Sequence, residues 1–210
     1  TTHGGEALKR LEGWDSDSGM WSGLSRKITN YTEDDQISQQ LLQRFAGMNW
    51  KNSRQRLWTW EDGQIQPSQI LSHIWSSENQ EWSNISRKTL EMGGNGLWSG
   101  SVVEIWSEAT SEWVNDVKET FTVDLGNNFS NYILELWNGE WQSDFRSQYS
   151  YAAAENMALL QRWNTEEMQH EDFLRYRSLF NNERLPIEQT GMQAWNADAD
   201  SWQNEDFTRR

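Results

Sequence analysis

A pair of Trp residues separated by six mostly polar residues recurs along this chain of 210 residues. The clearest copy joins Trp106 to Trp113, and the alternating apolar residues Val103 and Ile105 precede it. The second Trp opens another alternating stretch, which ends at Val123. Alternation with period two is typical of a half-buried β-strand, and two such strands around a polar loop indicate a β-hairpin. Because a lone hairpin is marginally stable in water, we expect several copies to lie side by side.

The same spacing joins Trp14 to Trp21, Trp75 to Trp82 and Trp195 to Trp202. Turn signals such as EDGQ at 61–64 and GGNG at 93–96 separate the copies. No shift in composition marks a boundary, so the chain is expected to have a flexible segment 1–6 and one domain over 7–210. That domain is predicted to hold seven hairpins, at 7–31, 37–60, 65–92, 97–123, 129–151, 157–180 and from 186 to the end.

The predicted fold class is all-β, an antiparallel meander of about 13–14 strands that coils or stacks as a repeat array. Closure of the meander into a β-barrel is the alternative. Two segments, 37–45 and 155–162, have residues that favour helix, so helices compete there with strands. The register of the repeat favours strands at both places.

Positions in each second strand can be counted from the aromatic residue that opens it. The residue at this position is Trp in most hairpins and His170 in the sixth, and a second Trp usually ends the first strand. Stacked strands would bring these rings together, and aromatic neighbours across strands stabilise a sheet. The predicted structural ladder consists of Trp21, Trp50, Trp75, Trp82, Trp106, Trp113, Trp137, Trp141, Trp163, Trp195 and Trp202.

In the first six hairpins a basic residue follows five positions after the opening aromatic, except in the second, where Gln55 stands there. Strict alternation would place position five on the opposite face from position zero. We therefore predict a basic column on the reverse face, with acceptors at Glu12, Glu104 and Glu135 on the preceding strands. This column consists of Arg26, Arg87, Lys118, Arg146 and Arg175.

Composition excludes several classes of protein. The net charge of −14 disfavours nucleic acid as a partner, because its phosphates would be repelled. Fifteen Trp in a chain that is only 35% hydrophobic suggest thin layers rather than a thick aliphatic core. The absence of Cys excludes disulfides and thiolate chemistry, and no apolar run is long enough to span a membrane. A start at Thr1 without Met suggests a processed form or a fragment.

Three stretches carry a resemblance to a known kind of protein: ILSHIWSSENQEWSNISRKTL, VVEIWSEATSEWVNDVKETFTVDLGNN and ILELWNGEWQSDFRSQYSY. They resemble the Trp-rich tandem repeats of secreted and cell-surface proteins of the Bacteroidota, which are similar in style to the YD repeats of RHS proteins. The resemblance implies export and a structural role outside the cell, as an adhesin stalk, a scaffold or a subunit of an extracellular filament.

Candidate chemistry is sparse. The three His residues, His3, His73 and His170, have no Ser, Cys or metal-ligand spacing around them, so we expect no enzyme activity and no cofactor. Alternating carboxylates in two loops make weak calcium candidates, although the closing bidentate Glu of a calcium loop is absent. These candidates are Asp15, Asp17, Asp198 and Asp200.

Two kinds of partner are predicted. The open ends of a meander expose unpaired backbone groups, so the chain is expected to associate with copies of itself through its edge strands. Exposed Trp and Tyr rings beside Asn and Gln would also suit a carbohydrate, so a carbohydrate-binding surface module is the alternative function.

Overall fold

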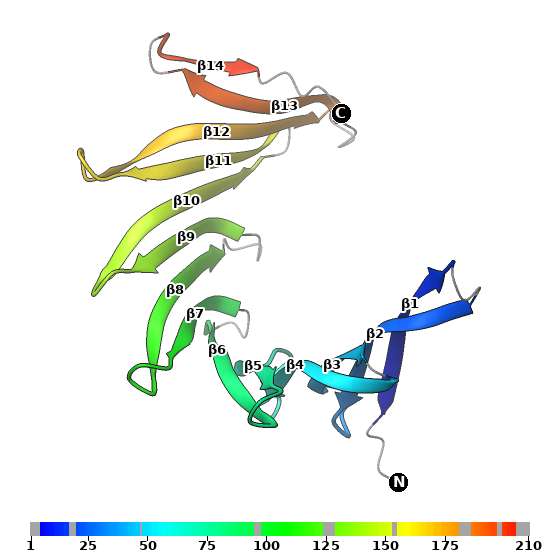
Figure 1. The fold of residues 1–210 in the computed structure, drawn as a ribbon. Helices are drawn as coiled ribbons and strands as arrows, with labels where there is room; N and C mark the ends of the chain where they lie inside the picture. The colour runs from blue at the N-terminus through cyan, green and yellow to red at the C-terminus, as the bar shows by residue number, and fades with distance from the viewer. Residues whose placement is uncertain are drawn as a thin grey trace. The chain divides into compact units, whose positions relative to one another are not determined.

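The computed structural model describes residues 5–16, 20–46, 48–94, 98–123, 129–152, 155–180, 186–196 and 199–204. These residues form a 14-stranded antiparallel sheet in which each strand pairs with its neighbours in sequence (Figure 1). The strands are β1 Glu6–Asp15, β2 Met20–Tyr31, β3 Ile37–Ala46, β4 Asn49–Thr59, β5 Gln69–Ser76, β6 Glu81–Met92, β7 Trp98–Ser107, β8 Glu112–Val123, β9 Phe129–Trp137, β10 Trp141–Tyr151, β11 Glu155–Asn164, β12 Gln169–Phe180, β13 Pro186–Asn196 and β14 Ser201–Asn204.

The all-β meander predicted from the sequence is confirmed, and the two segments with helical propensity are strands β3 and β11. The closed barrel is wrong: β1 and β14 stand at the two ends of the strand order, and their described residues pair only with β2 and β13. Several strand boundaries also differ from the predicted hairpin bounds, among them the following two. Strand β5 begins at Gln69 rather than Ile65, because Pro67 lies between them and lacks a backbone N–H. Strand β1 begins at Glu6 rather than Ala7, and Gly5 accepts a hydrogen bond from the backbone N–H of Tyr31.

Contacts divide the chain into two compact units. The first contains Thr1–Gly96 and Val102–Asp116, and the second contains Leu97–Ser101 and Val117–Arg210. The first unit holds the hairpins β1–β2, β3–β4 and β5–β6 together with the loop and adjoining strand ends of β7–β8. The second holds the hairpins β9–β10, β11–β12 and β13–β14. That residues 7–210 form a single domain stays a prediction.

The hairpin loops share one backbone conformation. The residue two positions before the second aromatic has a positive φ, as at Gln80 (57°), Ser111 (54°) and Met168 (54°), and Gly139 (81°) has this place in the fifth hairpin. The residue after the first Trp caps the turn with its side chain: Ser76 accepts a hydrogen bond from the backbone N–H of Asn79 at 3.2 Å. Such a cap stabilises a tight turn without requiring Gly throughout the loop.

A β-bulge recurs at one place in the second strand. Ser72 pairs with Ser86, but the next residue, His73, pairs with Asn84, so Ile85 is an extra residue. The extra residue lies three positions after the opening aromatic in five hairpins, at Leu24, Ser53, Ile85, Asp144 and Phe173. Because side chains alternate with period two, one extra residue moves every later side chain of that strand to the other face.

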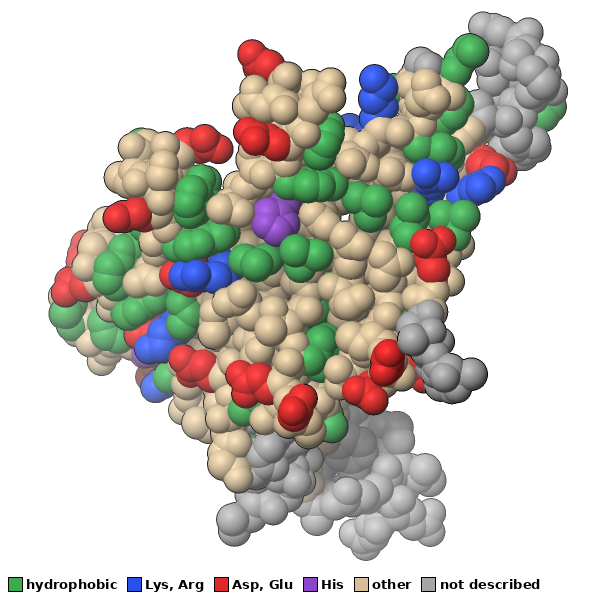
Figure 2. All heavy atoms as spheres, turned by 90° about the horizontal axis from the view of Figure 1, so that it is seen from below, with side chains coloured by type: hydrophobic (Ala, Val, Ile, Leu, Met, Phe, Trp, Pro, Cys, Tyr) green, Lys and Arg blue, Asp and Glu red, His purple; other side chains and the backbone are tan. Residues whose placement is uncertain are grey.

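Apolar side chains are half-buried or exposed. Among the described residues, none of the hydrophobic side chains is fully buried, whereas Thr29, Ser101, Ser147 and Gln161 are buried. Figure 2 shows hydrophobic side chains open to solvent between polar ones on one face of the molecule. The sheet is therefore stabilised by backbone pairing and by contacts between neighbouring side chains, each of which contributes about 0.2–1 kcal/mol.

Candidate functional site

In six hairpins the two aromatic residues that flank the loop pack edge to face, with interplanar angles of 64–73°. The described pairs, with the distances between ring centroids, are Phe45 and Trp50 (5.2 Å), Trp75 and Trp82 (5.1 Å), Trp106 and Trp113 (5.1 Å), Trp137 and Trp141 (5.1 Å), Trp163 and His170 (4.9 Å), and Trp195 and Trp202 (5.3 Å). Trp14 and Trp21 are opposite each other in the register of the first hairpin. We call the side of the sheet that carries these pairs the Trp face.

A cation from the preceding hairpin lies over the second ring of several pairs. The guanidinium carbon of Arg87 is 5.0 Å from the ring centroid of Trp113. The same contact joins Arg26 to Trp50 (4.8 Å), Lys118 to Trp141 (5.9 Å) and Arg175 to Trp202 (4.6 Å). A cation within about 6 Å of an indole centroid stabilises a partly exposed site by roughly 0.5–1 kcal/mol.

Each of these cations also has an acceptor on the strand that follows its own. Arg87 donates two hydrogen bonds to Glu104, at 2.7 and 2.6 Å, and Lys118 pairs with Glu135 at 3.0 Å. The hydrogen bond to Glu104 raises the pKa of Arg87. Where the acceptor is an amide, Arg26 donates to Gln43 at 2.6 Å, Arg146 to Gln161 at 2.7 Å and Arg175 to Gln193 at 2.7 Å.

Two of the Gln acceptors also donate a hydrogen bond, through the side-chain amide nitrogen, to the second strand of their own hairpin. Gln43 donates to Asn52 at 2.7 Å, and Gln161 donates to Asp172 at 2.6 Å. A hairpin therefore contributes a ring and an acceptor to the cation of the preceding hairpin, and most hairpins contribute a cation to the next.

The predicted basic column is placed wrongly by strict alternation. Arg26, Arg87, Lys118 and Arg175 contact Trp rings, so they lie on the Trp face and not on the reverse face. The bulge is the physical reason, because the extra residue at position three restores position five to the face of position zero. Their acceptors are on the following strand rather than the preceding one, and Glu104 and Glu135 serve in this role.

A glycine explains one irregular position. In the first hairpin Gly23 occupies position two, where most hairpins have Asn or Asp. A Cβ atom at Gly23 would lie 2.9 Å from two ring carbons of Trp50, which is closer than carbon atoms pack. The missing side chain therefore allows the ring of Trp50 to approach β2.

Two hairpins depart from this contact pattern. Gln55 replaces the cation, and its partner in register is His73, at the position of the usual acceptor. Burial lowers the pKa of His73, a hydrogen bond with Asn84 opposes that shift, and the Nδ1 atom of His73 is buried without a partner among the described residues. His170 replaces the opening Trp and packs against Trp163. Its pKa is lowered by burial and, to a smaller extent, by Arg146.

Shallow hollows lie between neighbouring aromatic pairs of the Trp face. Residues that line one of them, of about 300 Å³, include Trp50, Asn52, Trp75, Ser77 and Gln80. Another, of about 360 Å³, is lined by Gln169, His170, Glu171, Asp172 and Trp195. Rings next to amides and hydroxyls suit a sugar, which offers apolar CH faces and hydroxyl groups.

A second aromatic cluster, which the sequence reasoning missed, lies on the opposite face of the second unit. Phe121 packs between Trp98 (4.5 Å) and Tyr132 (4.9 Å), and Phe145 is 6.0 Å from Tyr132. Glu119 accepts hydrogen bonds from Ser101 at 2.7 Å and from the Tyr132 hydroxyl at 3.3 Å. Burial, with Glu119 nearby, raises the pKa of Tyr132 to about 12.

The calcium candidates gain no support. Asp17 and Asp198 lie outside the described residues, as does the side chain of Asp15, while Asp200 is exposed in its loop. No group of three or more potential metal ligands occurs in the described part of the chain. Nor does this part contain a helix that is long and apolar enough to cross a membrane.

Comparisons with known proteins give a likeness in structure alone. No family model and no curated protein matches the chain. A protein of unknown function from Bacteroides fragilis NCTC 9343 is similar with a TM-score of 0.48 and 16% identity, over 62% of this chain and 94% of the other. A DUF3836 family protein from Bacteroides vulgatus ATCC 8482 is similar with a TM-score of 0.37 and 15% identity, over 42% of this chain and 91% of the other.

Proposed function

We propose that this chain is a secreted or cell-surface structural protein, in which hairpins stack as a repeat array and form a scaffold, an adhesin stalk or a filament. The observation that carries the proposal is the recurrence of one set of contacts. The pair of rings, the cation over the second ring and the acceptor for that cation occur in hairpin after hairpin, in both units. An enzyme would instead concentrate its chemistry at one place.

The contacts also favour a structural use of the Trp residues. One face of the rings of Trp50, Trp113, Trp141 and Trp202 is covered by a cation, and one edge or face is in contact with the partner ring. These surfaces are already occupied within the protein. Contacts between successive hairpins of this kind are those from which repeat proteins derive their stability.

The experiment is immunogold electron microscopy of intact cells that produce the protein, followed by negative staining of the native material released from them. Label on the surface and elongated particles of constant width are expected. Label that appears only after the cells are permeabilised, with compact single particles, would contradict the proposal.

Self-association through the edge strand β1 is the second part of the proposal. Leu11 of β1 is 60% exposed, whereas Leu42, at the equivalent position of the next hairpin, is half-buried between β2 and β4. Leu8 and Trp14 of the same edge strand are 47% and 57% exposed. A strand from a second copy would cover these side chains and pair with the free edge of the backbone.

Sedimentation over a wide concentration range tests this association. The variant Leu8→Lys should remove it, because a Lys placed on an edge strand disfavours strand addition. The control is Ile65→Lys, which changes an apolar residue that is 74% exposed and outside the strands. A monomer at every concentration, or an equal effect of both variants, would contradict association through β1.

Carbohydrate binding is the alternative function, and the hollow between Trp50 and Trp75 is the observation that favours it. Gln80 and Asn52 provide planar hydrogen-bonding groups beside the two rings. Titration with neutral polysaccharides, followed by Trp fluorescence, tests this function, with Gln80→Ala as the variant and Gln64→Ala, outside the hollow, as the control. Saturable quenching that is weakened only by Gln80→Ala would support this alternative.

A further inference from the structure

The face of β1–β4 opposite the Trp face is strongly basic. The registers place Lys9 opposite Lys27, and Leu42 lies between Lys27 and Arg54. Alternation along β3 and β4, together with the bulge at Ser53, adds further cations to the same face. We call this surface the basic face; it contains Lys9, Lys27, Arg44, Lys51, Arg54 and Arg56.

The cations of the basic face lack acidic neighbours. Strands β2, β3 and β4 contain no Asp or Glu; in β1, Glu6 and Glu12 belong to the Trp face, and Asp15 is at the end of the strand, six residues from Lys9. In the part of the chain that the structure describes, none of the six pairs with a carboxylate. This concentration of positive charge is unexpected in a chain with a net charge of −14. Exposed cations that have no internal partner are available to a ligand.

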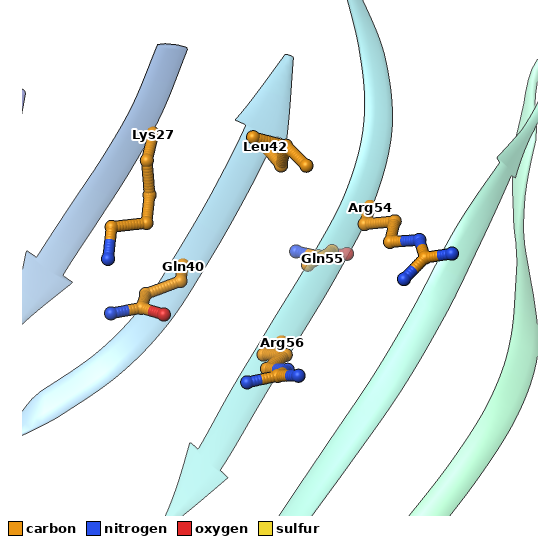
Figure 3. A pocket seen from close by; sticks show the side chains of 6 residues that line it. All are labelled: Lys27, Gln40, Leu42, Arg54, Gln55 and Arg56. Atoms are coloured by element: carbon orange, nitrogen blue, oxygen red, sulfur yellow. The ribbon is translucent and has the colours of Figure 1, made fainter. Parts of the chain in front are cut away.

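The basic face is also hollowed. A depression of about 280 Å³ is lined by Lys27, Gln40, Leu42, Arg54, Gln55 and Arg56. Figure 3 shows that these residues come from three adjacent strands, with Lys27 on β2, Gln40 and Leu42 on β3, and the other three on β4. The amide of Gln40 adds a hydrogen-bonding group, and Leu42 adds an apolar floor.

We propose that the basic face binds an acidic polysaccharide through its carboxylate or sulfate groups. Neighbouring strands are about 4.8 Å apart, and side chains on one face of a strand are about 6.6 Å apart, so the cations form a grid on an open surface. A polymer with closely spaced negative charges contacts several of these cations at once, whereas a single small anion contacts one or two. A duplex nucleic acid has a higher density of negative charge along its axis, so the negative charge of the remaining chain repels it more strongly.

The test measures binding of the full chain, in about 50 mM salt, to polygalacturonate, dextran sulfate, neutral dextran, duplex DNA and inorganic sulfate. Binding of polygalacturonate or dextran sulfate, which weakens steeply as salt is added, is expected, and the comparison of these two shows whether carboxylate or sulfate is preferred. Binding to neither polymer, equal binding to neutral dextran, or tighter binding to duplex DNA would overturn the proposal.

Matched variants locate the site. Arg54→Gln removes an exposed cation of the basic face, and Arg10→Gln removes an exposed cation of β1 that lies on the Trp face, opposite Arg26 in the register. We expect Arg54→Gln to weaken binding at least about fivefold and Arg10→Gln less than about twofold, because only Arg54 lies on the basic face. Both variants change the net charge equally, so a difference between them reports the position of the cation. Both variants should keep the melting temperature of the parent, since both side chains are exposed. Equal weakening by the two variants would show that net charge alone attracts the polymer, and would also overturn the proposal. None of these outcomes depends on self-association, so the structural proposal is tested separately.

Discussion

The missing cation of the second hairpin can be restored by design. Gln55 and His73 stand where the other hairpins have a cation and its acceptor, and Trp82 is at the position of the covered ring. The double variant Gln55→Arg with His73→Gln would reproduce the contacts that Arg26 makes with Gln43 and Trp50. It should stabilise the protein.

The size of the effect follows from three terms. A cation over Trp82 contributes about 0.5–1 kcal/mol. A hydrogen bond from a charged donor to the new amide contributes about 1.5–3 kcal/mol. Ordering the long Arg side chain costs about 1.5–2 kcal/mol. We expect a net gain of about 1 kcal/mol in the free energy of unfolding, which for a chain of this size raises the melting temperature by roughly 2–4 °C.

The assay is equilibrium unfolding in urea, followed by Trp fluorescence and by circular dichroism. The control is Gln55→Met with His73→Gln, which supplies a long side chain without a charge or a donor and removes the same unpaired His73 nitrogen. The reasoning is refuted when the variant with Arg is no more stable than the variant with Met. A further check is Gln55→Arg alone, which should lose its advantage as the pH falls through the pKa of the facing His73, which burial lowers from its ordinary value of 6.5.

Three further predictions use the same urea assay. Trp113→Ala should cost less than the roughly 3–5 kcal/mol of a fully buried aromatic, because Trp113 is half-buried. Trp14→Ala should cost clearly less than Trp113→Ala, because Trp113 has an aromatic partner and a cation over its ring while Trp14 is 57% exposed on the edge strand; equal midpoint shifts would contradict this. Met168→Gly should stabilise by about 0.5–1 kcal/mol, because Met168 has a φ of 54° and is 71% exposed, and a loss of stability would contradict the assigned loop conformation. The pKa of His170 is below its ordinary value of 6.5 in the folded chain, so the stability it contributes is present above that pH and is lost as the pH falls through the folded pKa. His170→Gln should flatten the decline in stability below pH 6.5, and an unchanged decline would exclude His170 as its source.

The hairpins could be predicted from the sequence because their signals are local. The spacing of Trp106 and Trp113 fixes the length of the loop, and the alternation up to Val123 defines a strand. The strand assignment of β3 and β11 followed from the register of the repeat rather than from local propensity, and this is where propensity alone would have failed.

The face of the basic residues could not be predicted by alternation, because one extra residue reverses it. A signal for the bulge is nevertheless present in the sequence. The acceptors Glu104 and Glu135 stand two positions before the first Trp of their hairpins, which places them on the Trp face. A cation five positions after the second Trp lies on the same face as such an acceptor only when a bulge adds one residue to the strand between that Trp and the cation. The exposed basic face went unnoticed because the total charge conceals its local excess of Lys and Arg.

The paired rings also give this protein an optical property. The indole rings of Trp75 and Trp82 have centroids 5.1 Å apart and an interplanar angle of 71°, so their electronic transition dipoles are close together and at a fixed angle to each other. Transitions in that arrangement couple, and the coupling produces a pair of circular dichroism bands of opposite sign. The pairs at Trp106 and at Trp137 have nearly the same geometry, so their signals add, while the pair that contains His170 contributes none. The intensity of this couplet therefore reports how many hairpins are intact as the chain unfolds, without any added label.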